Sequence, residues 1–271
     1  MAREIKPYEE LELKDDFMFG LIMHDSKYVK PFLEMILKIK IRKVVYPQSQ
    51  KSIDLSANAK AIRLDAYVED DQNTVFNLEM QTSDNRNLPK RMRYYQGVID
   101  LNILQKGQDY TKLKKSYVIF ICTFDPFGEG RHIYTFCNTC QENTALTLDD
   151  DAVKIILSTK GTMDDVSPEM KRILDYIAGK GASDEYTKQL EEAVRSARQN
   201  ESWRLGYMTL EYEYRQRYEE GLKEGEETGI AKTNERSIRK LYKRGESIAS
   251  IAEFVELDEE EVKRVIDAMK R

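Results

Sequence analysis

The sequence contains few of the residues that define several common protein classes. Its three cysteines, Cys122, Cys137 and Cys140, are an odd and small number. They do not suit a disulfide framework, so we expect reduced thiols and a cytoplasmic protein. No run of 18 apolar residues occurs, which predicts that no segment spans a membrane. The acidic N-terminal segment has no apolar stretch, so we expect no signal peptide.

Motifs for zinc, phosphate loops and serine hydrolysis are missing as well. Cys137 and Cys140 form a single C-x-x-C, and no second pair of ligands exists for a structural zinc site. The two histidines, His24 and His132, have no useful spacing. We interpret the cysteine pair as two thiols near the end of a strand.

The charge is acidic overall but unevenly distributed. The formal net charge is −5, which by itself does not indicate nucleic-acid binding. Residues 86–115, however, hold eight basic residues against two acidic ones, a local charge of +6. Such a basic stripe can bind phosphate within an acidic protein. The alternative interpretation is a solvated helix face.

Two strands joined by a polar turn are predicted between residues 62 and 81. Residues 62–68 and 74–81 alternate in the manner of strands, and residues 69–73 supply turn chemistry. Asp65 and Glu79 lie inside these apolar runs. If the hairpin folds back about Asp71, the two carboxylates lie near each other. Gln81, two residues after Glu79, points to the same face.

Two carboxylates held close together repel each other, and a bound divalent cation is the usual remedy. Carboxylate oxygens, an amide oxygen and water suit Mg²⁺ or Mn²⁺. This reasoning makes Asp65 and Glu79 candidate metal ligands. The alternative is that both side chains simply face solvent on a one-sided sheet.

The order of these residues resembles the metal site of PD-(D/E)XK nucleases. Asp65 in RLDAYVED is followed by Glu79 and Gln81 in NLEMQ, an Asp and then Glu-x-Gln on the next strand. The segments LKDDFMFGLIM and LPKRMRYYQGVID are similar to the recombination-promoting nuclease and transposase-like branch of that superfamily. Together these matches cover residues 11 to about 160. Members of the superfamily often carry Lys where this chain has Gln81.

The resemblance implies a metal-dependent DNA endonuclease linked to recombination or mobile elements. Asp65 and Glu79 would bind Mg²⁺ or Mn²⁺, and Gln81 would orient the water or contribute an oxygen. The resemblance also implies further candidates around these three. Arg91, Arg93 and Lys90 are candidates for contact with a DNA phosphate, since Arg suits bidentate phosphate contact, and Asp16 is a candidate additional acid. The alternative function is a catalytically silent DNA-binding or interaction protein with the same fold.

The remaining elements favour an α/β fold with a small central mixed sheet flanked by helices. The resemblance implies that this sheet is restriction-endonuclease-like. Helices are predicted at 9–24, 29–38 and 88–104. Further strands are predicted at 41–46, 116–124, 132–137 and 153–157. The run 116–124 is nearly all apolar, which is typical of a central strand buried on both faces.

An all-α extension is predicted to follow, so that the chain divides into 1–180, 181–231 and 232–271. One long charged helix is expected from Asp184 to about Gly229, with Trp203 to Tyr214 as a packing stripe. Gly221, Gly225 and Gly229 recur every four residues. This spacing suggests that another backbone approaches closely, and a frayed linker is the alternative. We expect a homodimer through this C-terminal helical region.

The last forty residues resemble a helix-turn-helix module. Helices are predicted at 237–244, 248–255 and 259–269. The third helix, however, begins with Glu259-Glu260-Glu261, where a recognition helix contacts DNA. Acidic groups at that end repel phosphates, so we interpret the module as a site for a partner protein or for the dimer.

Overall fold

The computed structural model describes residues 5–45 and 65–269. The chain divides into one compact unit, Lys6–Arg204, and a second that consists of Leu205–Arg271 with the first five residues. Each unit is described separately. None of the helices in the described ranges is both long and apolar enough to cross a membrane.

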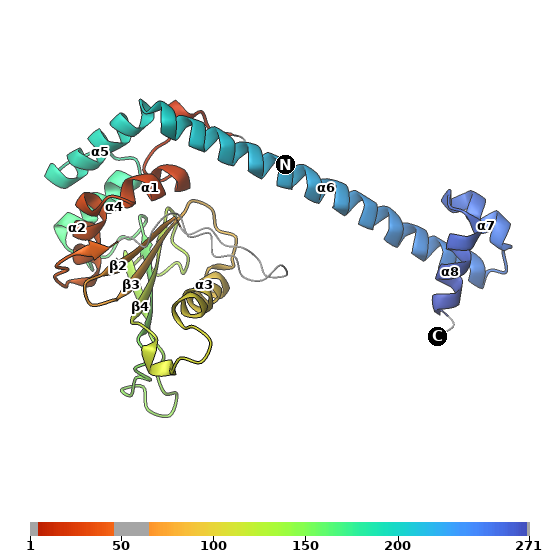
Figure 1. Ribbon diagram of the computed structural model, residues 1–271, viewed down its shortest axis with the longest axis horizontal. Helices are drawn as coiled ribbons and strands as arrows, with labels where there is room; N and C mark the ends of the chain where they lie inside the picture. Colours follow the sequence, from red (N-terminus) through yellow and green to blue (C-terminus); the bar gives the residue numbers. More distant parts are fainter. Residues whose placement is uncertain (1–4, 46–64, 270–271) are drawn as a thin grey trace. The chain divides into compact units, whose positions relative to one another are not determined.

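A mixed six-stranded sheet forms the centre of the first unit (Figure 1). Its strands are β1 (Val44–Val45), β2 (Ala66–Asp70), β3 (Val75–Gln81), β4 (Ser116–Cys122), β5 (Ile133–Phe136) and β6 (Ala152–Ser158). Their order across the sheet is β1-β2-β3-β4-β6-β5. The pairs β3–β4 and β4–β6 are parallel, whereas β1–β2, β2–β3 and β5–β6 are antiparallel. This arrangement is the predicted α/β fold with a central mixed sheet.

The predicted hairpin is confirmed for the described residues, while residues 62–64 of its predicted first strand lie outside them. Strand β2 continues to Asp70, so the turn lies between Asp70 and Val75. The Asp70 carboxylate accepts hydrogen bonds from the backbone N–H groups of Gln72 and Thr74, at 2.9 and 2.8 Å. Asn73 has a φ of +63°, a left-handed conformation that Asn tolerates better than most residues. These local contacts determine the β2–β3 register, which pairs Ala66 with Leu78.

Helices cover both faces of the sheet (Figure 1). Helix α3 (Leu88–Ile103) covers one face, and its residues Met92, Tyr95 and Ile99 pack against Val118 and Phe120 of β4. The helices α1 (Asp16–Met23), α2 (Ser26–Leu37), α4 (Pro168–Ile177) and α5 (Glu185–Arg198) lie on the other side. Two short 3₁₀ helices, η1 (Tyr8–Glu10) and η2 (Tyr110–Lys112), complete the unit.

Helix α5 is tied to the N-terminal part of the chain. The Tyr8 hydroxyl donates to the Ala197 carbonyl at 2.6 Å, and Arg198 Nε donates to the Leu11 carbonyl at 2.7 Å. The prediction of one continuous helix from Asp184 is wrong, because α5 ends at Arg198 and α6 (Glu201–Lys243) begins after Asn200. Asn200 Oδ1 accepts from the Trp203 N–H at 3.1 Å and so begins the new helix. The domain boundaries near residues 180 and 231 stay predictions.

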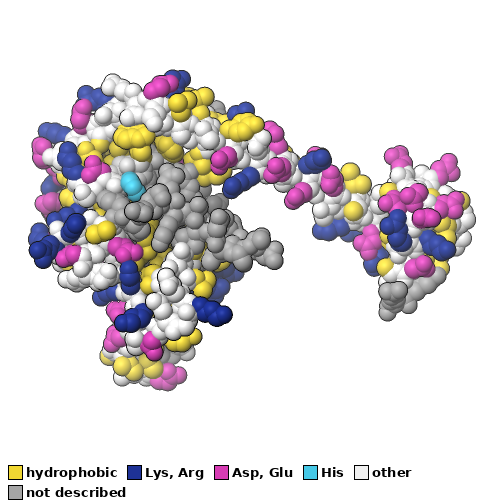
Figure 2. Space-filling view, in the orientation of Figure 1, with side chains coloured by type: hydrophobic (Ala, Val, Ile, Leu, Met, Phe, Trp, Pro, Cys, Tyr) yellow, Lys and Arg dark blue, Asp and Glu magenta, His cyan; other side chains and the backbone are white. Residues whose placement is uncertain are grey.

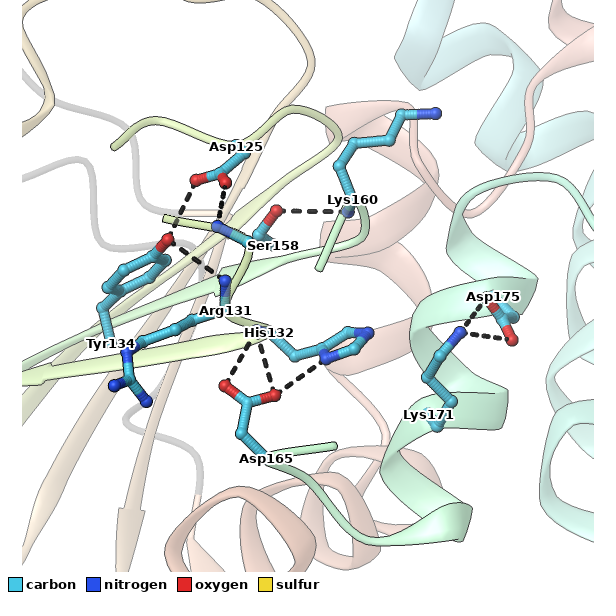
Figure 3. A network of polar contacts seen from close by, with 10 residues as sticks. Asp125, Arg131, His132, Tyr134, Ser158, Lys160, Asp165, Lys171 and Asp175 are labelled. Atoms are coloured by element: carbon cyan, nitrogen blue, oxygen red, sulfur yellow. Dashed lines mark hydrogen bonds and ion pairs between the residues drawn. The ribbon is translucent and has the colours of Figure 1, made fainter. Parts of the chain in front are cut away.

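A network of polar contacts joins the loops that follow β4 and β6 (Figure 3). Asp125 accepts a hydrogen bond from the Tyr134 hydroxyl at 3.0 Å, and Asp165 lies 2.8 Å from Nδ1 of the buried His132. A Cβ on Gly161 would lie 2.4 Å from the His132 ring, so only glycine fits there. Burial opposes ionisation of Asp165, but hydrogen bonds from His132 hold the pKa of this carboxyl below its usual value. The network therefore fixes the loops at the carboxyl edge of the parallel strands.

The second unit consists of most of α6 followed by α7 (Ile248–Val255) and α8 (Glu259–Met269). The predicted helices at 248–255 and 259–269 are confirmed. The one predicted at 237–244 is instead the last part of α6, which continues to Lys243. The three segments pack around a small apolar core of Ile238, Ile251, Ala252, Val255, Val262 and Ile266. Acidic side chains gather on the visible face of this module (Figure 2).

Candidate active site

The structure brings Asp65 and Glu79 together at one end of the β2–β3 hairpin. Asp65 directly precedes β2, and the register of the hairpin places it opposite Glu79. The Asp65 backbone N–H donates to Glu79 Oε1 at 3.2 Å, and the Met80 N–H donates to Asp65 Oδ2 at 2.9 Å. Only 3% of Glu79 is exposed, so this side chain does not face solvent. Each of the two carboxylates thus accepts a hydrogen bond from a backbone N–H on the opposite side of the hairpin.

Glu79 is in an environment that disfavours its charged form. Burial, and then the nearby Asp65 carboxylate, raise the pKa of Glu79 well above its usual value. The Asp65 backbone N–H, the Arg91 guanidinium and the Asn77 amide oppose this shift only in part. An ionised Glu79 therefore needs further positive charge, and a bound cation would supply it.

Gln81 is positioned by hydrogen bonds at both ends of its amide. Its Nε2 donates to the Ser83 carbonyl at 3.0 Å, and its Oε1 accepts a hydrogen bond from Arg91 Nη1. Arg91 lies on α3, and its Nη2 is 4.0 Å from Glu79 Oε2. The Gln81 amide therefore holds a guanidinium beside the Glu79 carboxylate.

Two aromatic rings hold Arg91 in place. Its Nη2 donates to the Tyr95 hydroxyl at 3.1 Å, and its guanidinium carbon lies 5.5 Å from the Tyr95 ring centroid and 5.2 Å from that of Phe120. These distances are typical of cation–π contacts. Burial, and then the Glu79 charge, raise the pKa of Tyr95 to about 12, so its hydroxyl stays protonated. By contrast, Lys90 and Arg93 of α3 are exposed.

Helix α1 touches the backbone of Asp65 through Gly20. A Cβ at Gly20 would lie 2.6 Å from the Asp65 carbonyl oxygen, closer than two such atoms can approach. Asp16 lies one helical turn before Gly20, and therefore on the side of α1 that faces Asp65. Asp16 thus stays a candidate additional acid.

We predict that Gly20→Ala will displace Asp65 and lower the melting temperature, because the added methyl group has no room. A clash of this kind costs about 1–3 kcal/mol. Gly97→Ala is the matched control, since Gly97 is also in a helix and a Cβ there meets nothing within 4 Å. The control should be stabilised by about 0.5–1 kcal/mol. Thermal unfolding of both variants tests this, and equal shifts would contradict the close contact at Gly20.

The donor set fits a hard divalent cation. Asp65 and Glu79 supply carboxylate oxygens, and Mg²⁺ commonly binds one or two carboxylates while keeping several waters. No group of three or more His, Cys, Asp or Glu side chains able to hold a metal ion occurs in residues 5–45 and 65–269. The two carboxylates fit a divalent cation such as Mg²⁺ or Mn²⁺.

Two features of this site were not predicted from the sequence. Tyr95 is a buried residue of the core, and its hydroxyl also accepts a hydrogen bond from Arg91. The spacing of Arg91 and Tyr95, one helical turn, was a usable signal. Asn77 was overlooked, although it lies two residues before Glu79 and therefore on the same face of β3.

The fold and this site define an α/β protein of the restriction-endonuclease-like type. A family model for the PD-(D/E)XK nuclease family transposases matches residues 14–178. Because this match covers more than half of the chain, the protein belongs to that nuclease-type, transposase-linked family. No curated protein and no solved structure matches the chain significantly.

Proposed function

We propose that the protein is a Mg²⁺- or Mn²⁺-dependent DNA endonuclease that acts in recombination or on mobile elements. The observation that carries this proposal is the pairing of Asp65 with the buried Glu79, since each side chain accepts a hydrogen bond from the other's strand. Such a pair of acids with a raised carboxyl pKa is typical of a functional site rather than of a stabilising contact. Family membership supports DNA as the substrate.

In this proposal Asp65 and Glu79 hold the cation, which when bound makes a coordinated water easier to deprotonate. Arg91 provides a fixed positive charge near Glu79, in a chain that has Gln81 where members of the superfamily often carry Lys. Gln81 positions the Arg91 guanidinium through its Oε1. Each end of an amide can make a second hydrogen bond, so Gln81 would also orient the water or contribute an oxygen. A guanidinium in this place can bind the scissile phosphate.

The exposed Lys90 and Arg93 lie on the same helix as Arg91. We assign them to contacts with the phosphate backbone away from the cleaved bond. Contacts of this kind are independent of sequence and weaken as salt rises. They therefore contribute to DNA affinity rather than to the chemical step.

The proposal predicts that the purified protein nicks supercoiled plasmid when Mg²⁺ or Mn²⁺ is present. Asp65→Ala removes one of the two carboxylates that bind the cation, and we expect nicking to fall by more than about a hundredfold. Arg93→Gln, an exposed change on α3, serves as the control and should keep the cleavage rate at saturating DNA. Equal nicking by wild type and Asp65→Ala would refute the site assignment.

A second candidate function, a catalytically silent DNA-binding or interaction protein, is favoured by one observation. Gln81 stands where other members have Lys, and it cannot act as a general base. A silent member does not need a cation between Asp65 and Glu79. The two functions are therefore distinguished by whether the protein binds divalent cations at this pair.

We further propose that the protein is a homodimer through the C-terminal region. Helix α6 carries exposed large apolar side chains, namely Trp203, Leu205, Met208, Tyr212, Tyr218, Leu222, Ile230 and Tyr242. Nothing lies within 4 Å of a Cβ built at Gly221, Gly225 or Gly229, so a second helix has room to approach α6 along these three glycines. A homodimer carries two active sites, which suits cleavage of both DNA strands.

The dimer is tested by light scattering on the full-length protein and on a chain ending at Arg204. We expect the mass of two chains for the former and of one chain for the latter at tens of micromolar, roughly the range in which weak association is seen. Gly225→Leu should weaken the dimer, because the larger side chain fills the space that the second helix would occupy. A monomeric full-length protein at that concentration would count against self-association through α6.

A further inference from the structure

Asn77 lies in the middle of β3 with its side chain fully buried, at 0% exposure. Within the described residues, neither its Nδ2 nor its Oδ1 has a hydrogen-bonding partner of ordinary geometry. Leaving a buried amide unpaired is costly, and folded proteins rarely do so without a functional reason. The Asn77 side chain therefore needs an explanation beyond packing.

The strands beside Asn77 provide no structural reason for an amide. Its neighbours across the sheet are Tyr67 on β2 and Val118 on β4, and Val118 belongs to the apolar core beneath α3. Asn is also an unfavourable residue in a strand interior. Residues two apart on a strand point to the same face, so the side chain next in line on β3 is Glu79. The Asn77 amide is close enough to that carboxylate to favour its charged form slightly.

We propose that Asn77 is a positioning residue of the cation site, whose amide fixes the orientation of the neighbouring Glu79 carboxylate when a divalent cation is bound. This inference rests on the proposed function. An amide can donate to a carboxylate oxygen and accept from a water molecule, and neither capacity is used in a well-formed hydrogen bond within the described part of the chain. Outer groups that orient a metal-binding carboxylate typically change metal affinity by about 10–100-fold.

Gln96 provides a matched control from the same layer, between α3 and the sheet. It is also buried, at 8% exposure. Its Nε2, however, donates to Asp100 Oδ1 at 3.0 Å and to Ser116 Oγ at 2.7 Å. Its Oε1 has no partner among the described residues, but its Nε2 makes two structural hydrogen bonds, whereas Nδ2 of Asn77 makes none. Gln96 is also not part of the proposed site.

The test replaces each amide by the apolar side chain of similar shape in the full-length protein and follows melting temperature as Mn²⁺ is added. Without metal, Asn77→Leu should melt about 2–4 °C higher than wild type, because an unpaired buried polar group is removed. The Mn²⁺ concentration that gives half of the maximal rise in melting temperature should be about 10–100-fold higher for Asn77→Leu than for wild type. Gln96→Leu should melt lower than wild type and keep the wild-type Mn²⁺ response.

A lower melting temperature for Asn77→Leu, or an unchanged Mn²⁺ midpoint, would overturn the inference. If that variant does not fold, Asn77→Ala and Asn77→Ser replace it, since both leave a similar cavity but only serine keeps a hydrogen-bonding group. The serine variant should then bind Mn²⁺ more tightly than the alanine variant, and equal midpoints would overturn the inference. If the melting temperature of wild type does not change with Mn²⁺ and wild type does not nick plasmid, both the proposed function and the role of Asn77 are refuted. If Mn²⁺ raises the melting temperature of wild type and the half-maximal Mn²⁺ concentration is the same for Asn77→Leu, only the role of Asn77 is refuted.

Discussion

Glu79→Gln is expected to abolish metal-dependent nicking and, at the same time, to make the metal-free protein more stable at neutral pH. Burial and the Asp65 carboxylate raise the pKa of Glu79, so the folded protein disfavours the ionised form more than the unfolded chain does. Glutamine has nearly the same shape and no charge. We expect a gain of about 0.5–2 kcal/mol, the range typical of a single stabilising substitution.

The pH dependence of this effect has a definite sign. A carboxyl whose folded-state pKa is raised stabilises the fold below its unfolded-state pKa, and this contribution is lost as pH rises through the folded-state pKa. The advantage of Glu79→Gln in metal-free buffer should therefore be small near pH 4.5, the ordinary pKa of a glutamate carboxyl, and should grow toward neutral pH. Thermal unfolding from pH 5 to pH 8 measures it. A Glu79→Gln protein that is less stable than wild type at every pH would contradict the account.

Arg91→Met is expected to reduce the nicking rate by about 10²–10³-fold, the usual cost of removing one preorganised group that stabilises charge. The substitution removes the hydrogen bond to Gln81 and the positive charge 4.0 Å from Glu79 Oε2. Arg91→Lys should recover only part of the rate, because an ammonium cannot contact Gln81 and Tyr95 in the same planar geometry.

The control for Arg91 is Arg93→Met, which removes an exposed arginine from the same helix. Arg93→Met should change the salt dependence of DNA binding and leave the single-turnover rate close to that of wild type. Comparing the two variants under single-turnover conditions separates the chemical step from DNA binding. Equal rates for Arg91→Met and Arg93→Met would mean that the guanidinium beside Glu79 has no part in the reaction.

The sequence was most informative where a local pattern determines the structure. Alternation predicted β2 and β3, and a nearly all-apolar run predicted β4. The turn at Asp70–Asn73 set the register, so the proximity of Asp65 and Glu79 followed from strand geometry. Helix α3 was predicted to within a residue, and its buried residues Met92, Tyr95 and Ile99 recur at helical spacing.

Features that depend on packing between distant segments were harder to predict. The contact of Gly20 with the Asp65 carbonyl joins residues far apart in sequence, and no local pattern reveals it. The hydrogen bond from Arg91 to Gln81 depends on how α3 lies on the sheet. The break between α5 and α6 was missed because helical periodicity continues through it, although Asn200 is a typical capping residue.

Calorimetric titration with Mn²⁺ shows most directly whether Asp65 and Glu79 together bind a divalent cation. We expect wild type to bind Mn²⁺, because the paired Asp65 and Glu79 carboxylates supply the oxygen ligands that this cation prefers. Asp65→Ala should show no binding in the same concentration range. Mn²⁺ binding that is the same in wild type and Asp65→Ala would contradict binding by this pair.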